Sequence, residues 1–235
     1  MPSLNLPTLN LISVIVTLVS AGVSLLTWYH HRGGPGLRGW ALALLLGSAG
    51  SYLYSLRGPD TSFRLILTGN ALYVAGFAAM WVSMRRFNDP SLASELMAAT
   101  TVAITTVFVL LFVLAWKAGP GVRAQSIVFS LFVFSLTTAA AWETWRGRRL
   151  DGLRSRSVAA IALAGIALVP LMRAAAVTLV GMGLLDIADW ATIRNYGNYA
   201  TTVFILVVTF GLVLMANERF ERQYAQQLDE LDARP

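Results

Sequence analysis

The sequence contains no cysteine, so disulfides and thiolate metal sites are excluded. Its two histidines, His30 and His31, are adjacent. Adjacent side chains on a helix point about 100° apart, so the pair cannot share one metal ion or ligate one haem. The single lysine, Lys117, lies between two apolar runs rather than in the last one, which excludes a retinal Schiff base there. We therefore expect no cofactor and no metal.

Charged residues are also scarce. They make up 13% of the 235 residues, whereas soluble domains carry about 25%. Hydrophobic residues make up 56%, and the mean hydropathy is +0.63. This composition is typical of a membrane protein. The formal net charge is +6, but the charges fall in short clusters between apolar runs, so we expect no nucleic-acid partner.

Acidic residues are missing from the middle of the apolar runs. Glu95 and Glu143 lie near the ends of theirs, and the other acids lie in expected loops or near the C-terminus. Ion-coupled carriers usually hold a carboxylate at mid-membrane, so this absence argues against that class. It also leaves no His–carboxylate pair to activate a buried Ser or Thr.

Seven apolar runs are long enough to approach the roughly 20 residues that a membrane-spanning helix needs. The second is the weakest by length. The residues before the first run lack the basic stretch of a signal peptide, so we expect an uncleaved first span. The sequence predicts an all-α seven-helix transmembrane bundle with spans at roughly 8–29, 39–56, 63–84, 92–116, 124–145, 158–185 and 195–217.

Arginine is concentrated on one side of these spans. The positive-inside rule places the segments after the first, third, fifth and seventh runs in the cytoplasm. The N-terminus is then outside and the C-terminus inside, which agrees with an odd number of spans. Twelve of the 18 basic residues lie in these segments: Arg32, Arg38, Arg85, Arg86, Arg146, Arg148, Arg149, Arg154, Arg156, Arg219, Arg222 and Arg234.

Arg173 lies inside the sixth run, about 15 residues or ~22 Å from its cytoplasmic end. An arginine near the centre of a membrane helix costs from about 2.5–3.5 kcal/mol upward. Two interpretations stay open. Arg173 either reaches toward the outer headgroups or the carbonyl freed by Pro170, or it anchors an anionic group in an outward-facing pocket.

Other polar and aromatic residues are expected at the same depth as Arg173. An interfacial aromatic belt explains part of this set, and a pocket for a small amphiphilic or anionic ligand explains the convergence of several helices. The predicted ligand-binding residues are Arg173, Asn70, Asn198, Tyr52, Arg64, Trp190 and Arg194, with Tyr54, Tyr196 and Tyr199 nearby and Asp186 and Asp189 as possible counter-charges.

The C-terminal stretch shows the alternating spacing of a coiled coil. Its seam has the polar residues Asn217 and Gln227 in it, and a helix this short is marginal alone. It fits a signalling helix held by a partner strand, or an amphipathic end on the membrane surface. The seam consists of Val213, Asn217, Phe220, Tyr224, Gln227 and Leu231. We divide the chain into a transmembrane domain, 1–217, and a linker helix, 218–235.

Four stretches carry a resemblance to a known family. They are "LNLPTLNLIS", "GPGLRGWALALLLGSAGSYLYSLRG", "LTGNALYVAGFAAMWVSMRRFNDP" and "LMANERFERQYAQQLDEL". They resemble the seven-helix N-terminal sensor region of bacterial GGDEF-domain diguanylate cyclases, in which the catalytic domain follows the last stretch. The 235 residues contain no GGDEF signature.

The resemblance implies a sensory module in the bacterial inner membrane. It further implies a parent protein that makes cyclic di-GMP from two GTP, and a homodimer, because two GTP-loaded domains must meet. The chain itself would hold no catalytic site. Two other functions stay open from the sequence: a small carrier or lipid-handling protein, and a passive membrane anchor.

Overall fold

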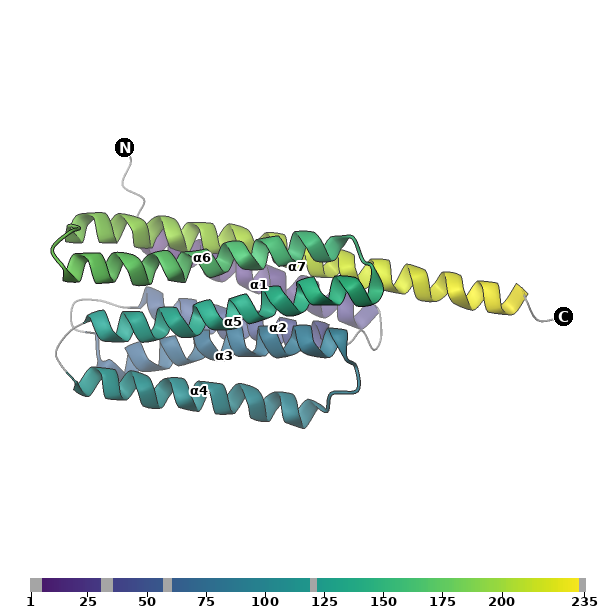
Figure 1. Ribbon diagram of the computed structural model, residues 1–235, viewed down its shortest axis with the longest axis horizontal. Helices are drawn as coiled ribbons and strands as arrows, with labels where there is room; N and C mark the ends of the chain where they lie inside the picture. The colour runs from purple at the N-terminus through teal and green to yellow at the C-terminus, as the bar shows by residue number, and fades with distance from the viewer. Residues whose placement is uncertain (1–5, 31–35, 57–60, 119–121, 233–235) are drawn as a thin grey trace.

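The computed structural model describes residues 6–30, 36–56, 61–118 and 122–232. Some side chains near helix ends, including those of Trp190 and Arg194, lie outside the described part. The described residues form an all-α bundle of seven helices (Figure 1). They are α1 Leu6–His30, α2 Leu37–Ser55, α3 Phe63–Asn88, α4 Ser94–Lys117, α5 Val122–Asp151, α6 Ser155–Gly181 and α7 Ile187–Asp232.

Six of the seven helices in the described residues are long and apolar enough to cross a membrane, so the chain is a multi-pass membrane protein. In such a helix every backbone N–H and C=O is satisfied within the segment, which lipid requires. The seventh helix, α2, is not one of these six. Its 19 residues span about 28 Å, but they include glycines and serines that lower its mean hydropathy. The second of the seven predicted spans, which the sequence marked as the weakest by length, is therefore not among the six, although α2 lies alongside α1 and α3.

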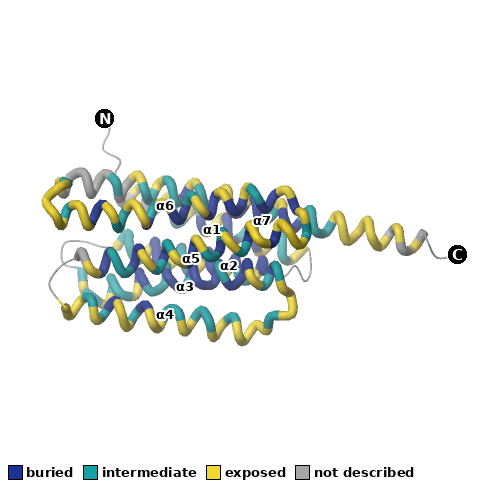
Figure 2. The backbone as a smooth tube through the Cα atoms, viewed as in Figure 1, coloured by how far each residue is buried: buried dark blue, intermediate teal, exposed yellow. Residues whose placement is uncertain are grey.

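Six helices form a closed ring, in the order α1–α2–α3–α5–α6–α7 and back to α1. The remaining helix, α4, lies outside the ring against α3 and α5. Figure 2 shows α4 as largely exposed. Its two buried residues are Phe108 and Phe112, whose rings meet those of Phe63, Phe129 and Phe132 at centroid distances of 5.3–6.4 Å. Aromatic contacts thus attach α4 to the ring.

Glycines allow close approach within the ring, as small residues do in membrane bundles. A Cβ on Gly76 of α3 would lie 2.9 Å from the backbone oxygen of Ala43 on α2. A Cβ on Gly211 of α7 would lie 3.0 Å from the Cβ of Ala159 on α6. The helix pairs α2–α3 and α6–α7 are therefore fixed at backbone contact distance.

The two ends of the bundle differ because α7 extends beyond one of them. We call the end with His30, Leu37, Asn88, Ser94, Asp151 and Ser155 the tail end, and the other the head end. From the tail end, α7 projects well beyond the other helices (Figure 1). Its 46 residues make a rod of about 69 Å.

Several helix ends differ from the sequence prediction. The fifth span, predicted to end at residue 145, continues as helix to Asp151, and α3 continues to Asn88. The seventh was predicted to begin at residue 195, with Asp189 in a loop, but α7 begins at Ile187. Polar helical turns outside the apolar window explain these differences. The proposed division at residue 217 falls inside α7, which runs across it without a break.

The turn after α3 is closed by Asp89. Its Oδ1 accepts hydrogen bonds from the backbone N–H and the hydroxyl of Ser91, at 3.0 and 2.5 Å. These bonds favour the charged carboxylate and lower the pKa of Asp89 below its usual value. The turn brings α4 back along α3 at the tail end.

Candidate functional site

A cavity of about 420 Å³ lies inside the ring, within the size range of small-molecule sites. All six ring helices line it, and α4 contributes none of the described lining residues. Representative lining residues, one per helix in ring order, are Ser13, Ser51, Tyr73, Phe129, Arg173 and Asn198. The cavity therefore depends on the whole ring rather than on one helix pair.

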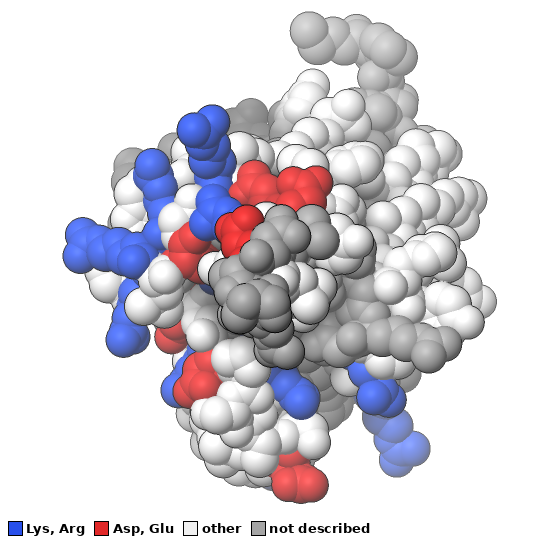
Figure 3. All heavy atoms as spheres, turned by 90° about the vertical axis from the view of Figure 1, so that its right-hand side faces the viewer, with Lys and Arg blue, Asp and Glu red and all other residues white. Residues whose placement is uncertain are grey.

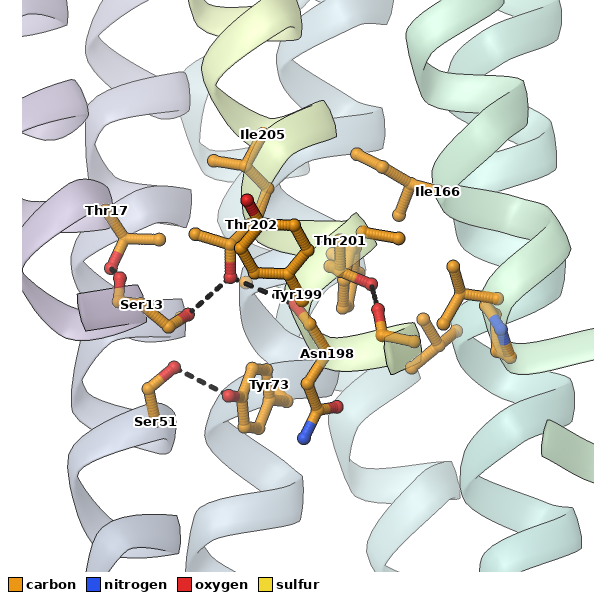
Figure 4. Close-up of a pocket in the computed structure, with 18 of the residues that line it drawn as sticks. Ser13, Thr17, Ser51, Tyr73, Ile166, Asn198, Tyr199, Thr201, Thr202 and Ile205 are labelled. Carbon is orange, nitrogen blue, oxygen red and sulfur yellow. Dashed lines mark hydrogen bonds between the residues drawn. The ribbon is translucent and has the colours of Figure 1, made fainter. Parts of the chain in front are cut away.

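Neutral hydroxyl groups join neighbouring helices at the cavity wall (Figure 4). Thr202 on α7 donates to the Oγ of Ser13 on α1 at 3.2 Å. The hydroxyls of Ser51 on α2 and Tyr73 on α3 lie 2.6 Å apart. Each hydroxyl has more than one hydrogen-bonding position, so these groups can hold the helices together and still meet a polar ligand.

A second hydroxyl pair continues the series along the same helices. Ser48 on α2 donates to the Oγ1 of Thr17 on α1 at 2.6 Å. Further along α1, Ser20 and Ser24 are buried as well. Polar side chains at spacings of four, three and four residues therefore mark the inward face of an otherwise apolar helix.

Arg173 is the one charged residue among the described lining residues. Its guanidinium carbon lies 5.3 Å from the centroid of the Phe129 ring on α5. This distance is typical of a cation–π contact. The ring supports one side of the guanidinium at the cavity wall, so the cation is positioned by a neighbouring helix.

Of the seven residues predicted to bind a ligand, two line the cavity: Arg173 on α6 and Asn198 on α7. Asn70 is buried on α3 but is not among the lining residues. Tyr52 and Arg64 are exposed. The side chains of Trp190 and Arg194 are among those outside the described part.

Sequence reasoning missed most of the hydroxyl lining. Single serines and threonines are common in membrane helices, and none of them stood out among apolar neighbours. The spacing of the polar residues on α1 was the available signal. It marks Ser13, Thr17, Ser20 and Ser24 as one helix face.

Sequence reasoning also missed a buried charge at the tail end. Arg156, 1% exposed, donates from Nε to both carboxylate oxygens of Asp151 at 2.8 and 3.0 Å. Its Nη1 donates to the Oδ1 of Asn88 at 2.6 Å, and its guanidinium lies 5.1 Å from the Phe87 ring. Asn88 in turn donates to the backbone oxygen of Glu143 at 2.8 Å. These contacts tie α3, α5 and α6 together.

The same contacts extend to α7 where it leaves the bundle. Arg219 donates to the backbone oxygen of Phe87 at 2.9 Å and lies 5.1 Å from its ring. Ser155 donates to Glu218 at 3.1 Å, and Arg222 donates to two backbone oxygens of the α5–α6 turn. Together these residues are the tail-end network: Phe87, Asn88, Glu143, Asp151, Ser155, Arg156, Glu218, Arg219 and Arg222.

Figure 3 looks onto the tail end, where basic side chains gather on one side with acidic side chains among them. Beyond the network the α7 surface is mostly exposed. Asn217 and Phe220 are half-buried, whereas Tyr224 and Leu231 are 66% and 62% exposed. The outer part of the predicted seam is therefore open to solvent or to a partner in this single chain.

The fold and the cavity define the class: a multi-pass, all-helical membrane protein with an internal cavity in its helix ring. Comparison with known protein families, curated proteins and solved structures finds no match to this chain.

Proposed function

We propose that the chain is a sensory module of a bacterial inner membrane. Its head end faces the outside and its tail end the cytoplasm, as the arginine distribution favours. A small molecule that reaches the cavity from the outer side changes the arrangement of the ring. The change passes along α7 to a cytoplasmic output domain, and the resemblance of four sequence stretches supports a diguanylate cyclase in the parent protein.

The observation that carries this proposal is the continuity of α7. The helix lines the cavity with Asn198, Thr202 and Ile205 and continues without a break to Asp232. A shift or rotation at the cavity therefore reaches the projecting tail without crossing a loop. The available free energy is the difference in ligand affinity between two arrangements of the bundle.

The tail-end network holds α7 against the ends of the other helices at the point where it leaves the bundle. Arg219 and Glu218 hold α7 to the ends of α3 and α6 about a dozen residues beyond Ile205. Side-chain contacts of this kind have discrete alternatives, which suits a two-state relay better than a gradual bend. Two such rods meeting in a homodimer would bring two output domains together.

A carrier is less well supported, because it needs a path through both halves of the bundle. Large buried side chains fill the ring between the cavity and the tail end. Trp40, Met84, Leu212 and Met215 are all 0–2% exposed. The cavity residues also include no carboxylate in the described part of the chain.

The test is a fusion that joins residues 1–232 to a diguanylate cyclase catalytic domain, with the heptad register of Phe220, Tyr224 and Leu231 continued into it. Cyclic di-GMP is measured in a strain without other cyclases, with and without added amphiphiles. We expect the output to change with an amphiphile. Arg173→Leu should abolish that response while leaving the basal output intact.

Replacement of residues 1–212 by an unrelated membrane anchor in the same register is the control. If that anchor supports the same output and the same response, the module is a passive anchor and the proposal is wrong. Substrate flux in vesicles containing the purified chain would instead favour the carrier.

A further inference from the structure

On three helices the cavity wall changes from polar near the head end to apolar nearer the tail end. On α6 the lining goes from Arg173 to Ile166, on α2 from Ser51 to Leu44, and on α3 from Tyr73 to Met80. On α7 the polar residues Asn198, Thr201 and Thr202 lie between Ile193 and Ile205.

Figure 4 shows this division in space. Ile166 and Ile205 stand at one end of the cavity, and Ser51, Tyr73 and Asn198 stand at the other. Along α7 the lining extends from Ile193 to Ile205, which corresponds to about 18 Å of helix. The cavity is therefore elongated along the bundle and has one polar and one apolar pole.

One charged side chain is found among the described residues of the polar pole. Arg173 lines it, and none of the described lining residues is acidic. The planar guanidinium favours carboxylate and phosphate, which it can bind through two N–H groups at once. Its contact with Phe129 holds the cation at the wall of the cavity, which Asn198, Ser51 and Tyr73 also line.

We propose that the cavity binds a single-chain amphiphile with an anionic headgroup. The head lies against Arg173 and Asn198, and the hydrocarbon chain runs toward the tail end past Phe77, Met80 and Ile166. A volume of about 420 Å³ lies in the lower part of the range for drug-sized ligands, which suits one chain. Apolar burial of the chain supplies affinity, and the arginine selects the head.

This inference rests on the same site as the proposed function and names its ligand class. The head lies between α6 and α7, so binding acts directly on the helix that leaves the bundle. Binding and relay are nevertheless separable by experiment. Affinity tests the ligand class, whereas the output of the cyclase fusion tests the relay.

The first experiment measures binding of chemically matched probes to the full chain in nanodiscs of neutral lipid. Dodecanoate and dodecyl phosphate represent the carboxylate and phosphate heads. Dodecyltrimethylammonium and dodecanol keep the chain but change the head, and acetate keeps the head without the chain. We expect the two anionic probes to compete for one site and to bind at least tenfold more tightly than the other three.

These comparisons use the unaltered protein, so they do not depend on a variant that folds. If the cationic or neutral probe binds as tightly as the anionic ones, the proposed preference for an anionic headgroup is wrong. If acetate binds as tightly, the proposed binding of a hydrocarbon chain is wrong. Preference for dodecanoate over dodecyl phosphate, or the reverse, distinguishes a fatty-acid-like source from a phosphate-headed one.

Variants then locate the head. Arg173→Leu should weaken dodecanoate at least tenfold, and Arg173→Lys should weaken it less because the charge remains. Arg64→Leu is the matched control, since Arg64 is an exposed arginine near the same end that does not line the cavity. Equal losses in Arg64→Leu and Arg173→Leu would indicate surface attraction and overturn the site.

A dodecanoate that carries a diazirine at its chain end locates the tail. After photolysis, mass spectrometry should find the label on peptides that contain Phe77, Met80 or Ile166. Labels confined to α4 or to the outer faces of the ring would place the chain in the surrounding lipid and overturn the proposed orientation. If binding follows the proposal but the cyclase fusion does not respond, the relay fails and the ligand assignment stands.

Discussion

Two arginines on the same helix show how the two halves of this bundle differ. Arg156, at the tail end of α6, is bound by the carboxylate of Asp151 and the side-chain oxygen of Asn88. Arg173, toward the head end, lies in the wall of a cavity that no described acidic residue lines. Both lie over a phenylalanine ring, at 5.1 and 5.3 Å. The same ring contact therefore accompanies an arginine bound to a carboxylate in one case and an arginine in a cavity wall in the other.

The same difference holds for the tail half and the head half of the bundle as a whole. At the tail end, charged groups and backbone oxygens from α3, α5, α6 and α7 satisfy one another at short distance. In the head half, neutral hydroxyl pairs join the helices around a cavity. A buried charge without its partner costs several kcal/mol, whereas a hydroxyl pair in a membrane bundle contributes about 0.6 kcal/mol on average. The tail half should be stiff and the head half adaptable.

The largest expected effect is at Arg156. Arg156→Leu removes the partner of Asp151 and the donor to Asn88, and should lower the free energy of unfolding by about 3 kcal/mol. Unfolding of the reconstituted chain by a denaturing detergent measures it. Arg154→Leu, an exposed arginine two residues away, should change stability by less than about 0.5 kcal/mol. Similar effects of both changes would show that the network is not the stabilising element.

Two glycines test the difference between the halves through packing rather than charge. A Cβ on Gly147 of α5 would lie 1.8 Å from Nη1 of Arg156 and 2.4 Å from Oδ1 of Asn88. Gly147→Ala should therefore cost about 1–3 kcal/mol. A Cβ on Gly47, in the cavity wall, would meet nothing within 4 Å.

Gly47→Ala should instead be neutral or stabilise the chain by about 0.5–1 kcal/mol, because alanine favours the helix interior. The same unfolding assay measures both glycine variants. A loss at Gly47 equal to that at Gly147 would mean that the head half is packed as tightly as the tail half.

Much of this fold was predictable, because long apolar runs in a membrane protein leave the backbone few alternatives to helix. The sequence predicted an all-helical multi-pass bundle, and the structure confirms it. Helix ends were less predictable. The extra turns to Asp151 in α5 and the early start of α7 at Ile187 are polar, and an apolar window does not detect polar helix.

The site was predictable only in part. Arg173 and Asn198 stand out as polar residues within apolar runs, and both line the cavity. Tyr52 lies on the outer surface, whereas Tyr54, two residues further along α2, lines the cavity. Helical phase decides between such neighbours, and it follows from packing rather than composition. The burial of Arg156 depends on Asn88, 68 positions away in the sequence, so only the fold reveals it.

A smaller effect is expected where α7 leaves the bundle. Arg219→Ala removes the donor to the backbone oxygen of Phe87 and the contact with its ring, and should cost about 1–2 kcal/mol. Because α7 would lose this contact with α3, a spin label at residue 224 should become more mobile. Glu221→Ala, an exposed change two residues further along α7, is the control and should leave the label unchanged. Equal mobility of the label in both variants would show that the tail-end network does not restrain the projecting part of α7.

The smallest effect is expected at the hydroxyl pair between α2 and α3. Ser51→Ala and Tyr73→Phe each remove one partner of the 2.6 Å contact and should cost about 0.6 kcal/mol, the average for such bonds in a membrane bundle. The double variant should cost hardly more than either single one, because both remove the same bond. Ser55→Ala is the matched control, since that hydroxyl donates to the backbone oxygen of Tyr52 on its own helix. A cost above about 2 kcal/mol would place this pair with the tail-end network and remove the contrast between an adaptable head half and a stiff tail half.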